Sequence, residues 1–154
     1  DKLISFDQLL EFQNDANTII LDTRSKDKYE AKHLAGAINL PFTEFTTERL
    51  RGLIPETNTR IIIYCNNNFI GDLKYFASKF FTPGMQGKKT MIKGGSILSP
   101  NSITLALNIP TYIALYGYGY RNIYELNELV NIDDPRVELE GHNGITRSNL
   151  LYKK

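Results

Sequence analysis

Short runs of consecutive apolar residues alternate along the chain with segments that place apolar residues at helical spacing. The runs at 18–22 and 60–64 are dominated by Ile and Leu and are bounded by polar residues, which is typical of strands buried on both faces of a parallel sheet. Shorter runs at 37–40, ended by Pro41, and at 122–126 predict two further strands.

Helical patterns separate these strands. Ser5 and Gln8 have the spacing of a capping box, with apolar residues behind them on one face. Further helices are predicted from Ser25 to about Lys32, over 43–53, over 71–81 and from Pro110 to Tyr116. Strands that alternate with helices predict an α/β fold, with a mostly parallel sheet covered by helices on both faces.

The regular alternation stops at Thr82. Residues 82–103 are rich in Gly and Lys and include a Gly-Gly pair between two short apolar runs, which predicts an inserted hairpin over 90–99. From Asn131 onward the chain is polar, and we expect a tail packed over the surface or partly disordered. The sequence therefore predicts one domain over 1–130, with an insert at 82–103, and a C-terminal tail over 131–154.

Composition narrows the classes of protein to consider. A chain of 154 residues with 42% hydrophobic and 23% charged residues is long and apolar enough for one soluble domain. A net charge of +1 argues against a nucleic-acid binder. No apolar run reaches the roughly 20 residues that a membrane span needs. The compartment stays open between the cytoplasm and export after removal of a signal, with a bacterial periplasm as one option.

The chain has a single cysteine, Cys65, which follows directly after the strand at 60–64. Ligands of open α/β sheets bind at the edge where the carboxyl ends of the strands lie. A short loop that turns its N–H groups inward and is followed by a helix stabilises a thiolate or a persulfide anion. We therefore predict Cys65 as a nucleophile. The alternative is a buried cysteine that acts as a small apolar residue. The residues predicted to bind the substrate through this loop are Asn66, Asn67, Asn68, Phe69, Ile70 and Gly71.

Two blocks upstream of Cys65 carry a family resemblance. Asp22-Thr-Arg-Ser25, then Tyr29, then His33-Leu-Ala-Gly-Ala-Ile-Asn-Leu-Pro41 resemble the signature of rhodanese-like domains over about residues 3–130. The resemblance implies a five-stranded sheet and a sulfurtransferase without a cofactor. Cys65 would accept a sulfane sulfur from a small donor as a persulfide and pass it to a thiol or cyanide. Asp22, Arg24 and His33 would then be structural, with Asp22 and Arg24 forming a pair that orders the loops.

The loop departs from the pattern of many active members of the family. No cation lies between Cys65 and Asp72, and Asp72 itself opposes a nearby thiolate. An anionic donor would then have to be bound by cations outside the loop, for which the candidates are Lys74, Lys88, Lys89 and Lys93. A phosphatase is disfavoured because Gly71 stands where a Cys-x5-Arg loop needs its arginine.

The main alternative to catalysis is a rhodanese-like module that binds a protein partner. The insert and the tyrosine-rich segment from Tyr112 to Tyr124 would supply its surface. Metal binding has no suitable pattern, because His33 and His142 are isolated and one thiol cannot assemble a zinc site.

Overall fold

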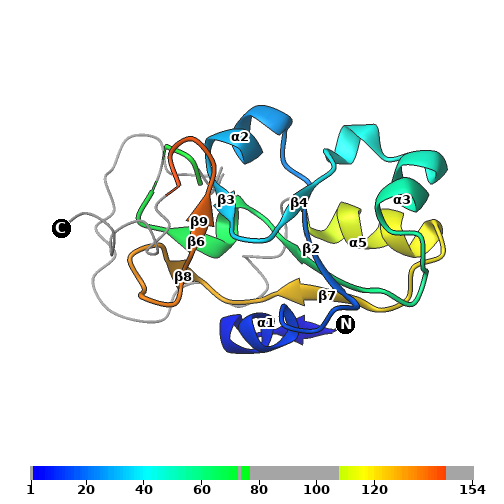
Figure 1. Ribbon diagram of the computed structural model, residues 1–154, viewed down its shortest axis with the longest axis horizontal. Helices are drawn as coiled ribbons and strands as arrows, with labels where there is room; N and C mark the ends of the chain where they lie inside the picture. The colour runs from blue at the N-terminus through cyan, green and yellow to red at the C-terminus, as the bar shows by residue number, and fades with distance from the viewer. Residues whose placement is uncertain (1, 73, 77–107, 145–154) are drawn as a thin grey trace, which may run out of the picture.

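The computed structural model describes residues 2–72, 74–76 and 108–144, which are built around a five-stranded sheet (Figure 1). In sheet order, the strands are β1 (Leu3–Ile4), β7 (Ile123–Leu126), β5 (Arg60–Tyr64), β2 (Thr18–Asp22) and β4 (Ile38–Asn39). All four neighbouring pairs are parallel. The predicted α/β fold is confirmed, and its sheet is wholly parallel. The strand β1 was not predicted, because two residues are too few to show a period.

The central strand β5 is buried on both faces. Ile62 and Tyr64 belong to one core cluster, whereas Ile61 and Ile63 belong to the other. Because successive side chains of a strand point to opposite faces, this division shows which way each residue of β5 points. The β-branched isoleucines that identified the strand in the sequence therefore form the middle of both cores.

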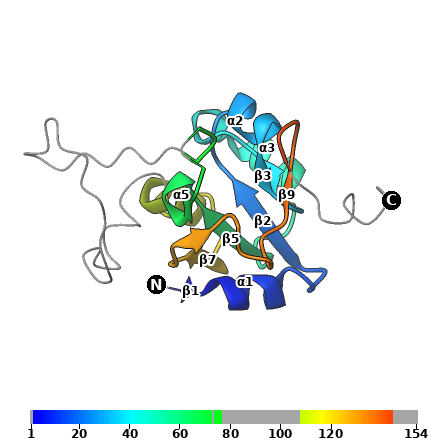
Figure 2. The same ribbon diagram turned by 90° about the vertical axis from the view of Figure 1, so that its left-hand side faces the viewer.

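Helices cover both faces of the sheet, as the sequence predicted. α1 (Phe6–Phe12) packs Phe6 and Leu9 into the cluster that contains Ile62. α3 (Thr47–Leu53) and α5 (Asn108–Gly117) pack into the cluster that contains Ile63. In Figure 2, α1 lies at the bottom of the view, on the other side of the strands from α3. The remaining described α-helix, α2 (Lys26–Ala31), follows β2.

Local hydrogen bonds explain where the helices begin. The capping box of Ser5 and Gln8 is present at the start of α1. Ser25 occupies the N-cap position of α2, but its side chain makes no capping bond. The single helix predicted over 43–53 is wrong. A 3-10 turn, η1 (Phe42–Glu44), is followed by a new start at Thr46, whose side chain accepts the N–H of Arg49.

The chain beyond β7 returns to the domain through two short strand pairs. β8 (Val130–Asn131) pairs in parallel with β6 (Phe69–Ile70), and β9 (Leu139–Glu140) pairs antiparallel with β3 (His33–Leu34). Val137 and Leu139 are buried in the core. Residues 131–144 are thus more ordered than the polar, irregular segment predicted, because pairs of two residues leave no pattern in the sequence. The boundary at residue 130 stays a prediction.

Several predicted elements lie outside the described residues. These are the insert at 82–103 with its hairpin, most of the helix predicted over 71–81, and the end of the chain from 145. Within the described part of that helix, residues 74–76 form a turn and a bend. None of the described helices has the length and apolar character that crossing a membrane requires.

Candidate active site around Cys65

Cys65 lies directly after β5, at the carboxyl edge of the central sheet. Its backbone is extended, with φ −134° and ψ 177°, and the residue is only 2% exposed. The extended backbone continues that of β5, and Cys65 belongs to neither of the two core clusters. The structure therefore places Cys65 in an enclosed position at the carboxyl edge of the sheet.

The chain after Cys65 turns once and then straightens. Asn66–Asn68 form the 3-10 turn η2, and Phe69–Ile70 form β6. The backbone N–H of Asn68 donates to the carbonyl of Cys65 at 3.1 Å and also faces its side chain, while the side-chain oxygen of Asn68 accepts the N–H of Cys65 at 2.9 Å. The second half of the predicted loop, from Phe69, forms β6 and pairs with β8.

The other predicted loop residues have distinct surroundings. Phe69 is buried and packs edge-on against Tyr64, with ring centroids 5.6 Å apart. Ile70 is 44% exposed. Gly71 has a φ of +101°, and a Cβ there would lie 2.9 Å from Ile132 Cγ1. Their predicted role in substrate binding stays a prediction.

Asn68 fixes the turn to the neighbouring strand. It is fully buried, and its side-chain nitrogen donates to the carbonyl oxygens of Leu126 at 2.8 Å and Glu128 at 3.2 Å. Together with the bond to Cys65, these contacts use both ends of the amide. Asn68 is therefore a structural anchor that holds the cysteine turn on the end of β7.

A buried ion pair supports the turn from the other side. Arg24 Nη2 lies 2.6 Å from Asp22 Oδ2, and both side chains are at most 2% exposed. Arg24 Nη1 donates to the side-chain oxygen of Asn66 at 3.1 Å and to the carbonyl of Tyr75 at 3.3 Å. The pair that the sequence predicted is thus observed, and it reaches the cysteine turn directly through Asn66.

Burial and hydrogen bonding keep Arg24 positively charged and Tyr64 neutral. Burial opposes the positive charge of Arg24, but its hydrogen bonds to Asp22 outweigh that cost and raise its pKa. Tyr64 donates its hydroxyl to Asp22 Oδ2 at 2.6 Å. Burial, with the charge of Asp22, raises the pKa of Tyr64 well above its usual value. The tyrosine therefore stays a neutral donor, and Asp22 has both a cation and a hydroxyl to satisfy it.

Sequence reasoning missed a second cation beside the turn. Lys32 Nζ lies 2.6 Å from Asp72 Oδ2, and the Lys32 ammonium lies 5.0 Å from the ring centroid of Tyr75. Burial disfavours the charged form of Asp72, but the hydrogen bond from Lys32 prevails and lowers the pKa of Asp72. Asp72 was expected to oppose a thiolate, yet its charge is compensated by Lys32. The only hint in the sequence was a lysine just before His33.

Of the other predicted cations, Lys74 shares these contacts, because its ammonium lies 5.0 Å from the ring centroid of Tyr75 and its backbone N–H donates to Asp72 Oδ1 at 3.1 Å. Lys74 is exposed, and the lysines of the insert lie outside the described residues. His33 stacks on Tyr29, with ring centroids 3.7 Å apart, and its Nε2 lies 3.4 Å from Glu140 Oε2. These contacts join α2, β3 and β9, which agrees with a structural role for His33. Among the described residues, no group of three His, Cys, Asp or Glu is placed to hold a metal ion.

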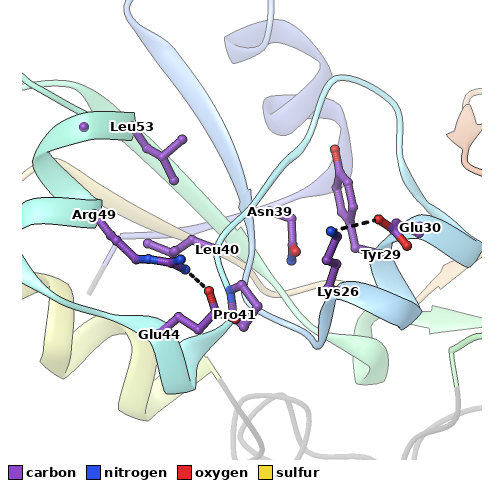
Figure 3. A pocket seen from close by; sticks show the side chains of 10 residues that line it. Lys26, Tyr29, Glu30, Asn39, Leu40, Pro41, Glu44, Arg49 and Leu53 are labelled. Atoms are coloured by element: carbon purple, nitrogen blue, oxygen red, sulfur yellow. Dashed lines mark hydrogen bonds and ion pairs between the residues drawn. The ribbon is translucent and has the colours of Figure 1, made fainter.

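A surface cavity of about 740 Å³ lies elsewhere, beside the edge strand β4 (Figure 3). Its charged side chains pair with one another, Lys26 with Glu30 at 3.5 Å and Arg49 with Glu44. It is lined by Lys26, Tyr29, Glu30, Asn39, Leu40, Pro41, Glu44, Arg49, Gly52 and Leu53. Neither Cys65 nor its turn contributes to this cavity, so we place the candidate site at the cysteine instead.

Several known proteins are similar to this chain in sequence or in fold. Thiosulfate sulfurtransferase PspE of Escherichia coli (strain K12) is 37% identical over 46 residues, which are 30% of this chain and 43% of that protein. The BH2092 protein of Bacillus halodurans shares the fold at 17% identity and a TM-score of 0.54, over 93% of this chain and 79% of that one. A rhodanese from E. coli with anions is 17% identical, with a TM-score of 0.43, over 80% of this chain and 98% of that one.

The aligned stretch in the curated relative is thus less than half of that protein's length. The family assignment rests on a longer match. The model of the rhodanese-like domain family matches residues 5–96, a span that includes Asp22, Arg24, His33 and Cys65. With the parallel sheet and a cysteine at the end of its central strand, this match shows that the chain belongs to the rhodanese-like domain family.

Proposed function

We propose that this domain is a sulfurtransferase that carries a sulfane sulfur on Cys65 as a persulfide. The observation that carries the proposal is the position of Cys65, at the carboxyl end of the central strand, with the N–H of Asn68 facing its side chain. A donor N–H at this place stabilises an anionic sulfur. The relative named thiosulfate sulfurtransferase supports the same class of reaction.

The proposed reaction has two displacement steps. In the first, the Cys65 thiolate attacks the outer sulfur of a donor such as thiosulfate, the S–S bond of the donor breaks, and sulfite leaves with the bonding electrons. In the second, cyanide or a thiolate attacks the outer sulfur of the persulfide, and the electrons of that S–S bond return to Cys65. The thiolate is restored, and the cycle needs no cofactor.

The charges near the turn bear on the choice of donor. Arg24 contacts Asn66 of the turn and Lys32 contacts Asp72, and each of these buried cations is paired with a carboxylate. A paired and buried cation attracts a dianion less than an unpaired one would. We therefore propose that neutral organic polysulfides, such as the trisulfide of a small thiol, or persulfides of small thiols are better donors than thiosulfate, which is a dianion.

A test measures thiocyanate formed from cyanide, with thiosulfate or such an organic polysulfide as donor. The proposal expects turnover with the wild type, faster with the polysulfide, and none above the uncatalysed rate with Cys65→Ser. Asn14→Ala, an exposed change at the end of α1, is the matched control and should turn over as the wild type does. Equal turnover by the wild type and Cys65→Ser would refute the proposal.

One observation favours the second candidate, a module that binds a protein partner without catalysis. Cys65 is 2% exposed, and the side chains of Asn66 and Asn68 are engaged in structural hydrogen bonds. If the domain is only a binding module, iodoacetamide should modify Cys65 no faster than the domain unfolds. A sulfurtransferase instead requires modification of the native protein, with a rate that rises with pH as the thiolate forms.

A further inference from the structure

The turn that follows β9 contains an asparagine directly before a glycine. Asn143 is exposed, and Gly144 comes next. This is the one place in the sequence where asparagine precedes glycine. Because glycine has no Cβ, its backbone nitrogen reaches the side-chain carbonyl of the preceding asparagine without hindrance. Asparagine is a thermolabile residue, and such a pair is its most reactive setting.

The fold requires the glycine of this pair. A Cβ at residue 144 would lie 2.5 Å from the backbone carbonyl carbon of Glu140, which is too close for any side chain. The N–H of Gly144 donates to the carbonyl of Gly141 at 3.1 Å and closes the turn. A larger residue after Asn143 would slow attack on its side chain, but the turn excludes one. The labile pair is thus a consequence of how the chain turns after β9.

The same turn fastens β9 to the rest of the domain. The N–H of His142 donates to the carbonyl of Glu30 at 2.9 Å, and the N–H of Asn143 donates to the carbonyl of Ala31 at 2.8 Å. Both carbonyls lie at the end of α2. Beside them, β9 pairs with β3 over two residues only. The hydrogen bonds of the turn therefore contribute much of what holds β9 in place.

We propose that Asn143 is a site of spontaneous deamidation, and that its conversion to isoaspartate releases β9 from β3. In the closed turn the N–H of Gly144 is bonded to Gly141. This bond must break before the nitrogen can lose its proton and turn toward the Asn143 side chain. A segment held by few buried contacts opens locally without unfolding of the whole domain. Opening of the turn therefore sets the rate of the reaction.

The chemistry is balanced with water alone. The Gly144 nitrogen loses its proton to solvent and attacks Cγ of Asn143, and the C–N bond of the side-chain amide breaks. The amide nitrogen takes up a proton and leaves as ammonia, so that a cyclic succinimide remains. Water then opens one of the two C–N bonds of the ring. One opening gives aspartate, and the other gives isoaspartate.

Isoaspartate changes the backbone, whereas aspartate does not. In isoaspartate the main chain runs through Cγ, so a methylene group is inserted between Cα of residue 143 and Gly144. The backbone N–H groups on either side of this insertion are those bonded to Ala31 and Gly141. The longer link breaks the spacing that lets both bonds form together. Aspartate keeps the ordinary backbone and adds only a charge, which makes Asn143→Asp a matched control.

The first experiment incubates the full chain and follows its peptides by mass spectrometry. Deamidation is read from the mass gained when OH replaces NH2, and isoaspartate from its separate elution. Asn143 should convert, and faster at pH 8 than at pH 6, because the Gly144 nitrogen must lose a proton. Asn58, which is exposed and precedes Thr59, is the internal control and should stay intact. No conversion at Asn143, or equal conversion at Asn58, overturns the site.

The second experiment tests whether opening of the turn sets the rate. Leu139→Ala removes a buried side chain of β9, and Leu50→Ala makes the same change in the other core cluster. Leu139→Ala should speed conversion about tenfold or more, because lost packing makes local opening easier. Leu50→Ala should convert as the wild type does. Where thermal melting shows that one of them does not fold, Val137→Ala or Ile54→Ala takes its place. Equal acceleration in both clusters overturns the local gate.

The third experiment measures the release of β9. The isoaspartate product is separated by ion exchange and compared by hydrogen exchange with the wild type and Asn143→Asp. Backbone N–H groups of β3 and β9 should exchange about tenfold faster in the isoaspartate product, because the pairing opens more often. In Asn143→Asp they should exchange as in the wild type. An isoaspartate product that exchanges as slowly as the wild type overturns the release.

Discussion

The guanidinium of Arg24 donates to the side-chain oxygen of Asn66, with Nη1 and Oδ1 3.1 Å apart. Arg24 lies two residues after the end of β2, and Asn66 lies two residues after the end of β5. The bond between them therefore holds the carboxyl ends of these two neighbouring strands together. Arg24 also donates to the carbonyl of Lys32 at 2.7 Å. A signature residue far from the cysteine in sequence is therefore part of the support of the cysteine turn.

Replacing Arg24 should destabilise the fold strongly. Arg24→Met leaves the buried carboxylate of Asp22 without its cation, which costs about 3–5 kcal/mol of unfolding free energy. Arg24→Lys should recover only part of this, because an ammonium cannot form the same planar set of hydrogen bonds. Urea unfolding measures both. Arg49→Met removes an exposed pair with Glu44 and should cost less than about 1 kcal/mol. A similar loss in all three variants would contradict this role for Arg24.

Removing the Asn68 amide should loosen the cysteine turn. Asn68→Ala abolishes the bonds to Leu126 and Glu128 and leaves their buried carbonyls without this donor, which costs about 1–3 kcal/mol. Native-state modification of Cys65 by iodoacetamide should become faster than in the wild type. Asn14→Ala, which removes a bond to Leu10 in an exposed position, is the control. An unchanged rate of modification would show that the amide does not hold the turn.

Gly71 should tolerate no side chain. Its φ of +101° is unfavourable for other residues, and a Cβ would lie 2.9 Å from Ile132 Cγ1 and 3.0 Å from Asn131 Oδ1. Gly71→Ala should therefore destabilise the domain by about 1–3 kcal/mol. Gly52→Ala is the matched control, because nothing lies within 4 Å of its added Cβ and it lies in α3, where alanine is stabilising. Thermal melting should separate the two variants in opposite directions.

The pair of Lys32 and Asp72 should make stability depend on acid pH. The pKa of Asp72 is lowered in the folded state, so its contribution is present above its unfolded pKa of about 3.9 and is lost as pH falls below that value. Asp72→Asn should be less stable than the wild type at pH 6. The difference between the two should shrink as pH falls from about 4.5 to 3. A constant difference over this range, measured by urea unfolding, would contradict the ion pair.

The sequence predicted the elements with strong local signals. The isoleucines of β5 and the apolar run of β2 give their strands directly, and Ser5 with Gln8 gives the start of α1. The break at Thr46 escaped prediction because a capping threonine inside a helical pattern looks like any other polar residue. The strands β6, β8 and β9 escaped because their pairing is set by distant segments, not by local periodicity.

The site was predictable in its centre and less so in its surroundings. The pair of Asp22 and Arg24 was predicted from the sequence and is observed, the role of Cys65 stays a prediction, and Lys32 was missed. Polar residues of this kind look like surface positions until tertiary structure buries them.

The central claim is that Cys65 carries sulfur, and intact-mass spectrometry after incubation with a polysulfide tests it most directly. The account predicts the addition of one sulfur atom to the wild type, its removal by cyanide, and its location on Cys65 by peptide mapping. Cys65→Ser should acquire none. A wild type that gains no sulfur from any donor while its fold is intact would contradict the account.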